Sequence, residues 1–390
     1  MSKIYDLMKK LFIPLFVGLF AFKALAQEST RVITTAVPFL QIAADPRAGG
    51  MGDIGVSTSA DAFSQQWNPA KYAFAISKQG VGITYTPYLS NLVNDIFLGN
   101  LVYYNRLNER SAISSSFRYF SLGEIELRED IAQDPLIASP NELTFDVAYA
   151  LRLSERFSMA VAGRYLRSDL KLQTSIEDAS AASSFAVDIA GYYQSEEIAY
   201  GDFDGRWRAG INISNMGPKI KYDEVGQENF LPTQLALGAG FDFILDAYNK
   251  IGVNTQFNKL LVPTPPDLDG LSPEEAQDAI DEYNDINWFS GIFKSFGDAP
   301  GGFSEELKEW TWALGAEYWY QDVFAFRTGY FHESPEKGAR QFLSLGAGFR
   351  YTAINIDISY LFSTSAVRSP LEGTLRFGLI FNFGDEYSEY

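Results

Sequence analysis

Large apolar residues alternate with small or polar residues along most of the chain after residue 76. In Leu143–Leu153, every odd position is large and apolar and every even position is small or polar. The same alternation runs through 235–245, 354–363 and 371–383. A period of two is typical of a β-strand whose two faces meet different surroundings. The chain is therefore predicted to be all-β over this region.

Fourteen such segments are expected, an even number. In a soluble sandwich the apolar faces point inward, whereas in an outer-membrane barrel they point outward to lipid and the polar faces line the lumen. The segments are about 10 to 16 residues long, against five or six for soluble strands and about 9 to 11 for a tilted membrane strand. Their lengths favour an antiparallel transmembrane barrel, with strands near 78–88, 96–107, 110–123, 141–153, 156–168, 181–194, 205–215, 232–245, 248–260, 309–320, 322–332, 340–352, 354–363 and 371–383.

The connections between these segments alternate in length. Those after even-numbered strands are short, with 195–204 as the exception, and those after odd-numbered strands are long and polar, up to 261–308. Outer-membrane barrels have short periplasmic turns and long outer loops, whereas a sandwich has no reason to sort its loops in this way. Tyr and Trp near the strand ends fit aromatic girdles, although ordinary core aromatics are the alternative: Tyr103, Tyr104, Tyr192, Tyr193, Trp310, Trp312, Tyr318, Trp319 and Tyr320.

Residues 1–26 have the pattern of a cleaved signal peptide. Lysines precede a twelve-residue apolar run, and an A-x-A site predicts cleavage between Ala26 and Gln27, hence export. The formal charge of −18 argues against nucleic acid as a partner. The absence of cysteine excludes disulfides and thiolate metal sites, and the single histidine, His332, excludes histidine metal clusters. No cofactor is expected.

The stretch GMGDIG, residues 50–55, matches the dinucleotide fingerprint G-x-G-x-x-G. That motif needs a preceding strand, a following helix and an acidic residue about 20 positions later. The lead-in at 44–47 has turn chemistry and no acid lies near residue 75, so the cofactor interpretation is rejected. We expect residues 27–76, rich in Gly, Ala and Ser, to fold back as a plug inside the barrel formed by 77–390.

The stretch from Ala36 to Ala70 resembles the N-terminal signature of the PorV family, outer-membrane proteins of the type IX secretion system of Bacteroidetes. Similar forms occur more widely in barrels similar to the FadL fatty-acid transporters. The matching residues are Arg47, Gly50, Met51, Gly52, Asn68, Pro69 and Ala70. The resemblance implies a FadL-like barrel in the outer membrane that is not an enzyme. It implies binding to the C-terminal signal domains of secreted proteins, docking on the large translocon barrel, and delivery to a sortase-type attachment complex. Lipid and lipopolysaccharide would surround it.

The long loop 261–308 is the candidate partner-binding region. Ser272, Pro273 and Glu275 predict a capped helix from about 273 to 286. An apolar stripe follows, which either docks a partner or packs on the barrel's own rim: Trp288, Phe289, Ile292, Phe293 and Phe296. Acidic residues at 267, 269, 278, 281 and 285 lack the spacing of a calcium loop, so a solvated face is favoured over Ca²⁺ binding.

Charged residues on the predicted lumen faces are expected to pair across the barrel and hold the plug: Asp146, Arg152, Arg164, Arg206, Arg208, Glu317 and Arg350. Two other functions stay open. The first is a FadL-like channel for hydrophobic small molecules. The second is a surface esterase using His332 beside Glu333, which no G-x-S-x-G motif accompanies.

Overall fold

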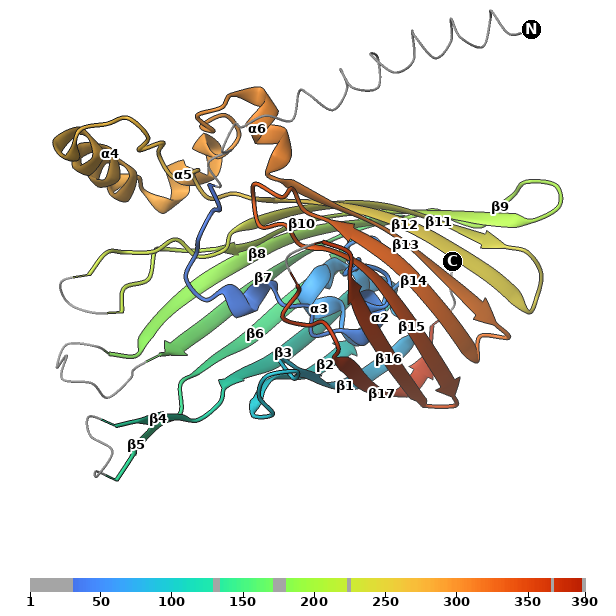
Figure 1. The fold of residues 1–390 in the computed structure, drawn as a ribbon. Coiled ribbons are helices and arrows are strands. Elements are labelled where there is room, and N and C mark those ends of the chain that lie inside the picture. The colour runs from blue at the N-terminus through green and yellow to red at the C-terminus, as the bar shows by residue number, and fades with distance from the viewer. Residues whose placement is uncertain (1–30, 129–133, 171–179, 223–225, 366–367, 388–390) are drawn as a thin grey trace, which may run out of the picture.

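The computed structural model describes residues 31–128, 134–170, 180–222, 226–365 and 368–387. Fourteen antiparallel strands close into a barrel, because β1 pairs with both β2 and β17 and β10 pairs with both β8 and β11 (Figure 1). The strands are β1 (Ser77–Pro87), β2 (Ile96–Arg106), β3 (Ser111–Leu122), β6 (Asn141–Arg152), β7 (Phe157–Asp169), β8 (Ala182–Gln194), β10 (Asp204–Met216), β11 (Gln234–Ile244), β12 (Asn249–Leu260), β13 (Trp310–Tyr320), β14 (Phe324–His332), β15 (Gln341–Tyr351), β16 (Ile354–Ser363) and β17 (Leu375–Glu386). The predicted fourteen-stranded barrel is confirmed, with strand ends shifted by a few residues.

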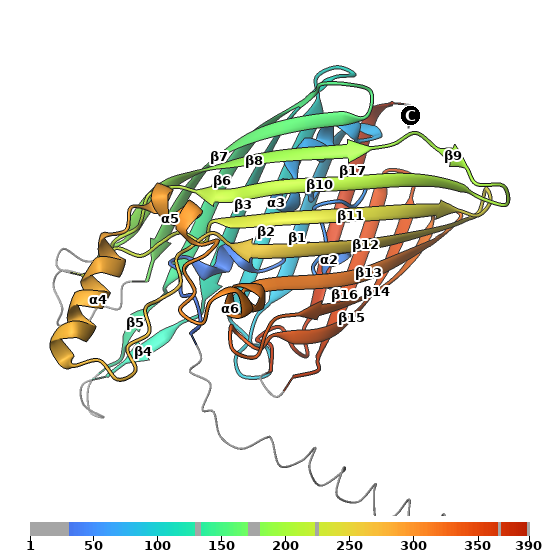
Figure 2. The same cartoon turned by 90° about the horizontal axis from the view of Figure 1, so that it is seen from above.

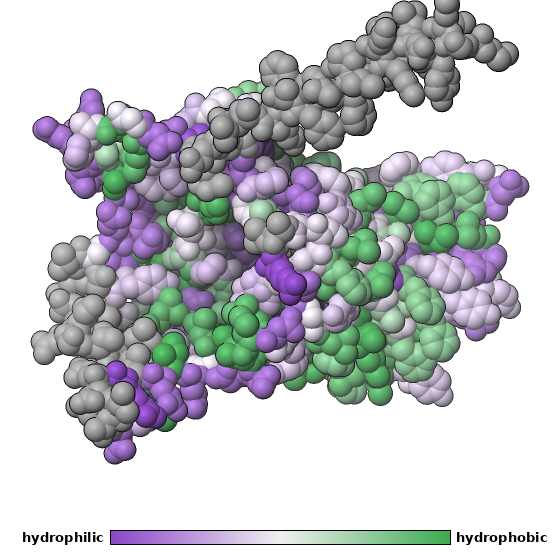
Figure 3. Space-filling view, in the orientation of Figure 1, coloured by the Kyte–Doolittle hydropathy of each residue, from purple (hydrophilic) through white to green (hydrophobic). Residues whose placement is uncertain are grey.

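The apolar faces of these strands point out of the barrel. On β6, Phe145 and Val147 are 49% and 50% exposed, whereas Thr144, Asp146 and Ala148 are buried on the lumen side. Figure 3 shows hydrophobic side chains gathered on the outer wall over β15–β17. Covering such a side chain with hydrocarbon contributes about 1.5 to 3 kcal/mol, so this surface is stable only in a lipid or detergent environment. The sandwich alternative, with its apolar faces inward, is wrong.

Short turns lie at one end of the barrel and long connections at the other (Figures 1 and 2). Following the usual arrangement of bacterial barrels, we call the end with the long connections the outer end. The connection after β3 contains a small hairpin of β4 (Ile125–Leu127) and β5 (Leu136–Ala138), and β9 (Ile198–Ala199) extends beside β10 at the opposite end. None of the described helices is long and apolar enough to cross a bilayer.

The connection between β12 and β13 carries α4 (Pro273–Asp285), α5 (Trp288–Lys294) and α6 (Phe303–Lys308) at the outer end (Figure 2). The predicted helix is confirmed as α4. The Ser272 hydroxyl accepts from the backbone N–H of Glu275, and the Glu275 carboxylate accepts from the N–H of Ser272 at 2.8 Å. This capping box fixes where the helix begins.

The N-terminal segment, residues 31–76, runs through the lumen from the outer end to the start of β1. It contains four short helices: η1 (Pro38–Gln41), α2 (Pro46–Gly49), α3 (Ser64–Trp67) and η2 (Pro69–Phe74). Figures 1 and 2 show α2 and α3 enclosed by the strands. The buried apolar clusters lie between this segment and the wall, for example Met51 and Ile54 against Ala313 and Phe331. The barrel therefore has its core inside and its largest apolar surface outside. The predicted signal peptide and its cleavage site at Ala26 and Gln27 lie outside the described residues.

Candidate functional site

Arg47 joins the N-terminal segment to the barrel wall. Its guanidinium donates to both carboxylate oxygens of Glu317 on β13, at 3.0 and 2.8 Å, and to Asp61 at 2.8 Å. Glu317 also accepts from Arg327 on β14 at 2.5 Å, and Arg327 donates to Asp357 on β16 at 2.6 Å. Bidentate, charge-assisted bonds of this kind are the strong ones, and every member is buried or nearly so. The chain of alternating charges ties the segment to three strands.

The glycines of GMGDIG allow the segment's backbone to touch the wall. Gly52 has a φ of +78°, and a Cβ there would lie 3.0 Å from the Tyr330 carbonyl oxygen. A Cβ on Gly50 would lie 2.9 Å from the Cα of Gly346. Only glycine allows the positive φ at position 52 and the close approaches at positions 50 and 52 without a shift of the neighbouring atoms. These residues serve close packing of backbone against backbone, with no strand leading in and no helix leaving as a phosphate loop requires.

Asn68, Pro69 and Ala70 form a buried corner of the segment. The Asn68 amide donates to the carbonyls of Val56, at 3.0 Å, and Gly191 on β8, at 2.9 Å. Its Oδ1 caps η2 by accepting from the N–H of Ala70, and Pro69 occupies the first helical position. The corner thereby fixes the second half of the segment to β8, four strands away from the Arg47 contact on β13.

The predicted lumen charges do not pair across the barrel as expected. Asp146 and Arg164 are directly opposed neighbours on β6 and β7, and Arg164 also contacts Asp188 on β8 at 3.0 Å. Arg206 pairs with Glu197, Arg208 pairs with Asp242, and Arg350 lies over the Trp319 ring, whereas Arg152 lies over the ring of Phe74 on the N-terminal segment. Among the predicted residues, Glu317 makes a salt bridge to the segment. Neighbouring strands approach within about 5 Å, so pairing along the wall needs no reach across the lumen.

The apolar stripe on α5 divides between inside and outside. Ile292 is buried, and Gly291 beside it approaches Pro263 and Phe230. Trp288 is half-buried. Phe289, Phe293 and Phe296 are 57%, 65% and 50% exposed, and Phe303 and Leu307 on α6 are also exposed. We call these five exposed residues the cap patch. One side of the stripe packs on the protein, as the second alternative expects, and the other side is left open.

Acidic side chains hold α6 to the outer end of the barrel. Lys259 on β12 contacts Glu306 at 3.1 Å and Glu309 at 2.6 Å, and Lys337 contacts Glu305 at 2.6 Å and Glu309 at 3.0 Å. The Glu305 carboxylate also accepts from Arg31 at 2.8 and 3.1 Å. Hydrogen bonds from Arg31, with further help from Lys337 and the backbone of Gly301, lower the pKa of Glu305 to about 2 against the cost of its burial. The same cluster of charges thus holds both α6 and Arg31, at the beginning of the described N-terminal segment, in place.

His332 is not part of an acid–base pair in the described residues. Its ring stacks on Trp312, with centroids 5.1 Å apart, on the outward face of the wall. The neighbouring Glu333 instead binds Arg340 through two bonds of 2.8 Å. This arrangement gives the esterase hypothesis no support.

Of the acidic residues considered for calcium, Asp267 and Asp269 precede α4 and the other three lie on it. Asp267 pairs with Arg31 at 2.6 Å, and α4 has no buried residue. The described part of the chain holds no group of three or more residues that could hold a metal ion.

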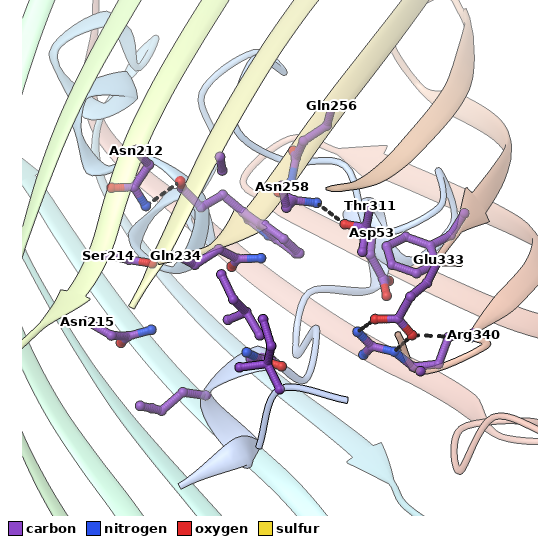
Figure 4. A pocket seen from close by; sticks show the side chains of 18 of the residues that line it. Asp53, Asn212, Ser214, Asn215, Gln234, Gln256, Asn258, Thr311, Glu333 and Arg340 are labelled. Atoms are coloured by element: carbon purple, nitrogen blue, oxygen red, sulfur yellow. Dashed lines mark hydrogen bonds and ion pairs between the residues drawn. The ribbon is translucent and has the colours of Figure 1, made fainter. Parts of the chain in front are cut away.

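A cavity of about 370 Å³ lies between the N-terminal segment and strands β10–β13 (Figure 4). Amide and hydroxyl side chains surround it, namely Asn212, Ser214, Gln234, Gln256, Asn258 and Thr311. Sequence reasoning missed this site. Its signal was present in the polar positions of 205–215, 232–245 and 248–260, which hold amides where other lumen faces hold Ala or Gly.

Comparison with known proteins identifies a family and a fold. Residues 25–267 match the family model described as type IX secretion system protein PorV. A TodX deltaS2S3 mutant, titled a monoaromatic hydrocarbon channel, is 9% identical with a TM-score of 0.51, over 87% of this chain and 98% of that one. A FadL homologue of Pseudomonas aeruginosa is 11% identical with a TM-score of 0.47, over 91% and 100%. The TodX likeness shows the barrel fold alone. A search of curated proteins gave no match.

Proposed function

The chain belongs to the family of the type IX secretion system protein PorV, and on that premise we propose that it is a shuttle for secreted cargo. It binds the C-terminal signal domains of secreted proteins, docks on the large translocon barrel, and passes the cargo to a sortase-type attachment complex. The family and the barrel fold support a place in the outer membrane.

The cap patch is the observation that carries this proposal. Five large apolar side chains are exposed on one connection at the outer end, beyond the strands that lipid would cover. Within it, the rings of Phe289 and Phe293 lie 5.4 Å apart, and clustered exposed apolar side chains are typical of protein-binding sites. Salt bridges through Glu305, Glu306 and Glu309 hold its base in place, so the patch is presented on a fixed support. A fixed apolar surface can bind without first losing the entropy of a free loop.

The filled lumen supports a role as receptor and adaptor. The N-terminal segment packs against the wall over its whole length, with buried clusters near both ends. A folded protein cannot pass through such a barrel while the segment is in place. Cargo is therefore expected to be handled on the outside of the barrel and conducted by a partner.

Uptake of hydrophobic molecules is the second candidate, and it rests on the fold. That function needs a continuous apolar path. The cavity in this lumen has amides, hydroxyls and charged groups beside apolar residues such as Leu40, Leu260 and Phe342, and an apolar solute would leave those polar groups without hydrogen bonds. The structure therefore favours the secretion role.

Complementation of a deletion strain tests the proposal. The variant Phe289→Ser/Phe293→Ser/Phe296→Ser should behave like the deletion, with cargo trapped in the periplasm or released unattached. Its matched control is Leu268→Ser/Leu271→Ser, which changes exposed apolar residues of the same connection outside the patch. Surface-attached cargo is measured by labelling intact cells, and the amount of each barrel by immunoblot. Normal attachment in the deletion strain would refute the shuttle role. Normal attachment in the triple variant alone would refute the cap patch as the contact.

A further inference from the structure

The floor of the lumen cavity is a single row of side chains across four strands. Asn212 on β10 is the cross-strand neighbour of Ala236 on β11, which neighbours Asn258 on β12, which neighbours Thr311 on β13. Ala236 carries only a methyl group, so the row leaves space between two amides. Ser214 and Gln234 are paired in the row just above, toward the outer end. Asn212 and Asn258, which both line the cavity (Figure 4), thus flank Ala236, and we call this stretch of the lining the basin.

Two buried polar atoms around this basin have no hydrogen-bond partner among the described residues. The Asn212 amide nitrogen donates to the Trp67 carbonyl at 2.9 Å, but its Oδ1 has no partner among the described residues. Arg118 lines the cavity from β3, and its Nη1 likewise has none there. Both side chains are buried. A buried polar atom without a partner costs about 1 to 3 kcal/mol, so such groups indicate a polar occupant.

Apart from Arg118, which lies 3.8 Å from Asp146, the charged residues that line the cavity are engaged in close ion pairs. Arg340 forms two hydrogen bonds with Glu333, and Lys337 bridges Glu305 and Glu309. An ionic ligand would have to compete with these pairs, and an apolar ligand would bury amides without partners. Amide, hydroxyl and aromatic surface remains, with Trp67 and Phe342 among the lining residues. The Phe331 ring is itself covered, by Phe342 with centroids 4.9 Å apart and by the Arg340 guanidinium 5.6 Å from its centroid.

That combination fits a sugar. An amide offers both a donor and an acceptor, which matches pairs of neighbouring hydroxyls, while aromatic rings pack against the C–H faces of a pyranose. The volume of about 370 Å³ is within the range of small-molecule pockets, about 300 to 1,000 Å³. The cavity's rim includes Val32, which is 42% exposed, and Arg340, both at the outer end.

We propose that this cavity binds an uncharged, multiply hydroxylated small molecule of the saccharide class, which enters from the outer end. The site is separate from the cap patch and does not depend on the secretion role. Its occupant would sit against the N-terminal segment, between residues 32–41 and the wall.

Maltose is the probe, titrated into the purified full-length barrel in an amine-oxide detergent, because maltoside detergents carry the probe's own headgroup. Saturation-transfer NMR and calorimetry should show saturable binding with a Kd of about 1 mM or lower. Ala236→Phe fills the basin with a ring and should weaken binding at least tenfold. Ala239→Phe, on the lipid face of the same strand, is the matched control and should bind normally. If Ala236→Phe does not fold, Gln234→Ala should weaken binding in its place.

Three results would overturn the proposal. The first is the absence of saturable maltose binding at concentrations about ten times that Kd. The second is equal weakening by Ala236→Phe and Ala239→Phe, which would place the sugar elsewhere. The third is binding of laurate that Ala236→Phe blocks while maltose fails to bind, which would make the cavity an apolar site. None of these results bears on cargo attachment, so the two proposals fail separately.

Discussion

Replacing Arg47 by Met should release the N-terminal segment from the wall at its strongest contact. The substitution keeps most of the side-chain volume but removes the guanidinium, leaving Glu317 and Asp61 without their shared partner. Removing one member of a buried ion pair costs about 3 to 5 kcal/mol. Glu317 keeps Arg327 as a partner, so the loss should lie near the lower limit, about 3 kcal/mol.

Arg156→Met is the matched control. Arg156 also donates to a carboxylate through two nitrogens, to Glu196 at 2.8 and 3.3 Å, but both side chains are exposed. Exposed pairs contribute about 0.2 to 1 kcal/mol, so this variant should lose at least three times less stability than Arg47→Met.

The free energy of unfolding is measured by urea denaturation in detergent micelles, followed by circular dichroism. A loss of about 3 kcal/mol lowers the midpoint by about 1 M urea if the slope is about 3 kcal/mol per molar. Limited proteolysis below the transition reports separately on release of the segment, because local opening precedes global unfolding. If Arg47→Met does not fold, Arg47→Lys retains the charge without the fork and should show part of the loss. Equal losses in Arg47→Met and Arg156→Met would refute the view that this network anchors the segment.

Two further perturbations test other contacts of the segment. Gly329→Ala puts a Cβ 2.0 Å from the Met51 carbonyl carbon, whereas a Cβ at Gly163, on the lipid face of β7, meets nothing within 4 Å. Gly329→Ala should therefore lower the free energy of unfolding by about 1 to 3 kcal/mol through overpacking, and Gly163→Ala should leave it almost unchanged. Equal urea midpoints for the two variants would contradict the close packing. Glu305→Gln should destabilise the protein most at pH 7, less at pH 3 and almost not at all at pH 2, because a carboxyl whose pKa is lowered to about 2 adds its full stability above its usual pKa of 4.5 and loses it as the pH falls from there through 2. A difference from the parent protein that stays constant between pH 7 and pH 3 would contradict the contribution assigned to the Glu305 carboxylate.

The barrel was predictable because its determinants are local. Alternation along a strand is set by the pleat, so 143–153 already shows which face is apolar. Alternation alone does not say whether that face meets a core or lipid. Strand length and the alternation of short and long connections favoured lipid. Strand length reflects the thickness of the membrane, and the alternation of connections reflects its two sides. Some ion pairs were equally within reach, because Glu317 and Arg327 are directly opposed across a short turn, as are Asp146 and Arg164.

The contacts of the N-terminal segment were not predictable, because they join residues far apart in the chain. Arg47 and Glu317 are separated by 270 positions, and nothing in either stretch indicates the other. The same holds for α5, where the stripe at 288–296 gave the apolar residues but not that Ile292 would be buried and Phe289 and Phe293 exposed.

Glycines in the barrel wall form the surface against which the GMGDIG stretch packs. A glycine inside a strand ordinarily weakens it and marks a bulge or the close approach of another backbone. Cβ atoms on Gly315 and Gly329 would lie 2.5 and 2.0 Å from backbone atoms of Met51, and one on Gly346 would lie 3.0 Å from the Cα of Gly50. These three strand glycines and the glycines at 50 and 52 therefore form one interface, with Met51 at its centre and Ile54 and Arg327 beside it. A chain that kept GMGDIG but carried Ala at the three wall positions would lack the surface into which that stretch fits.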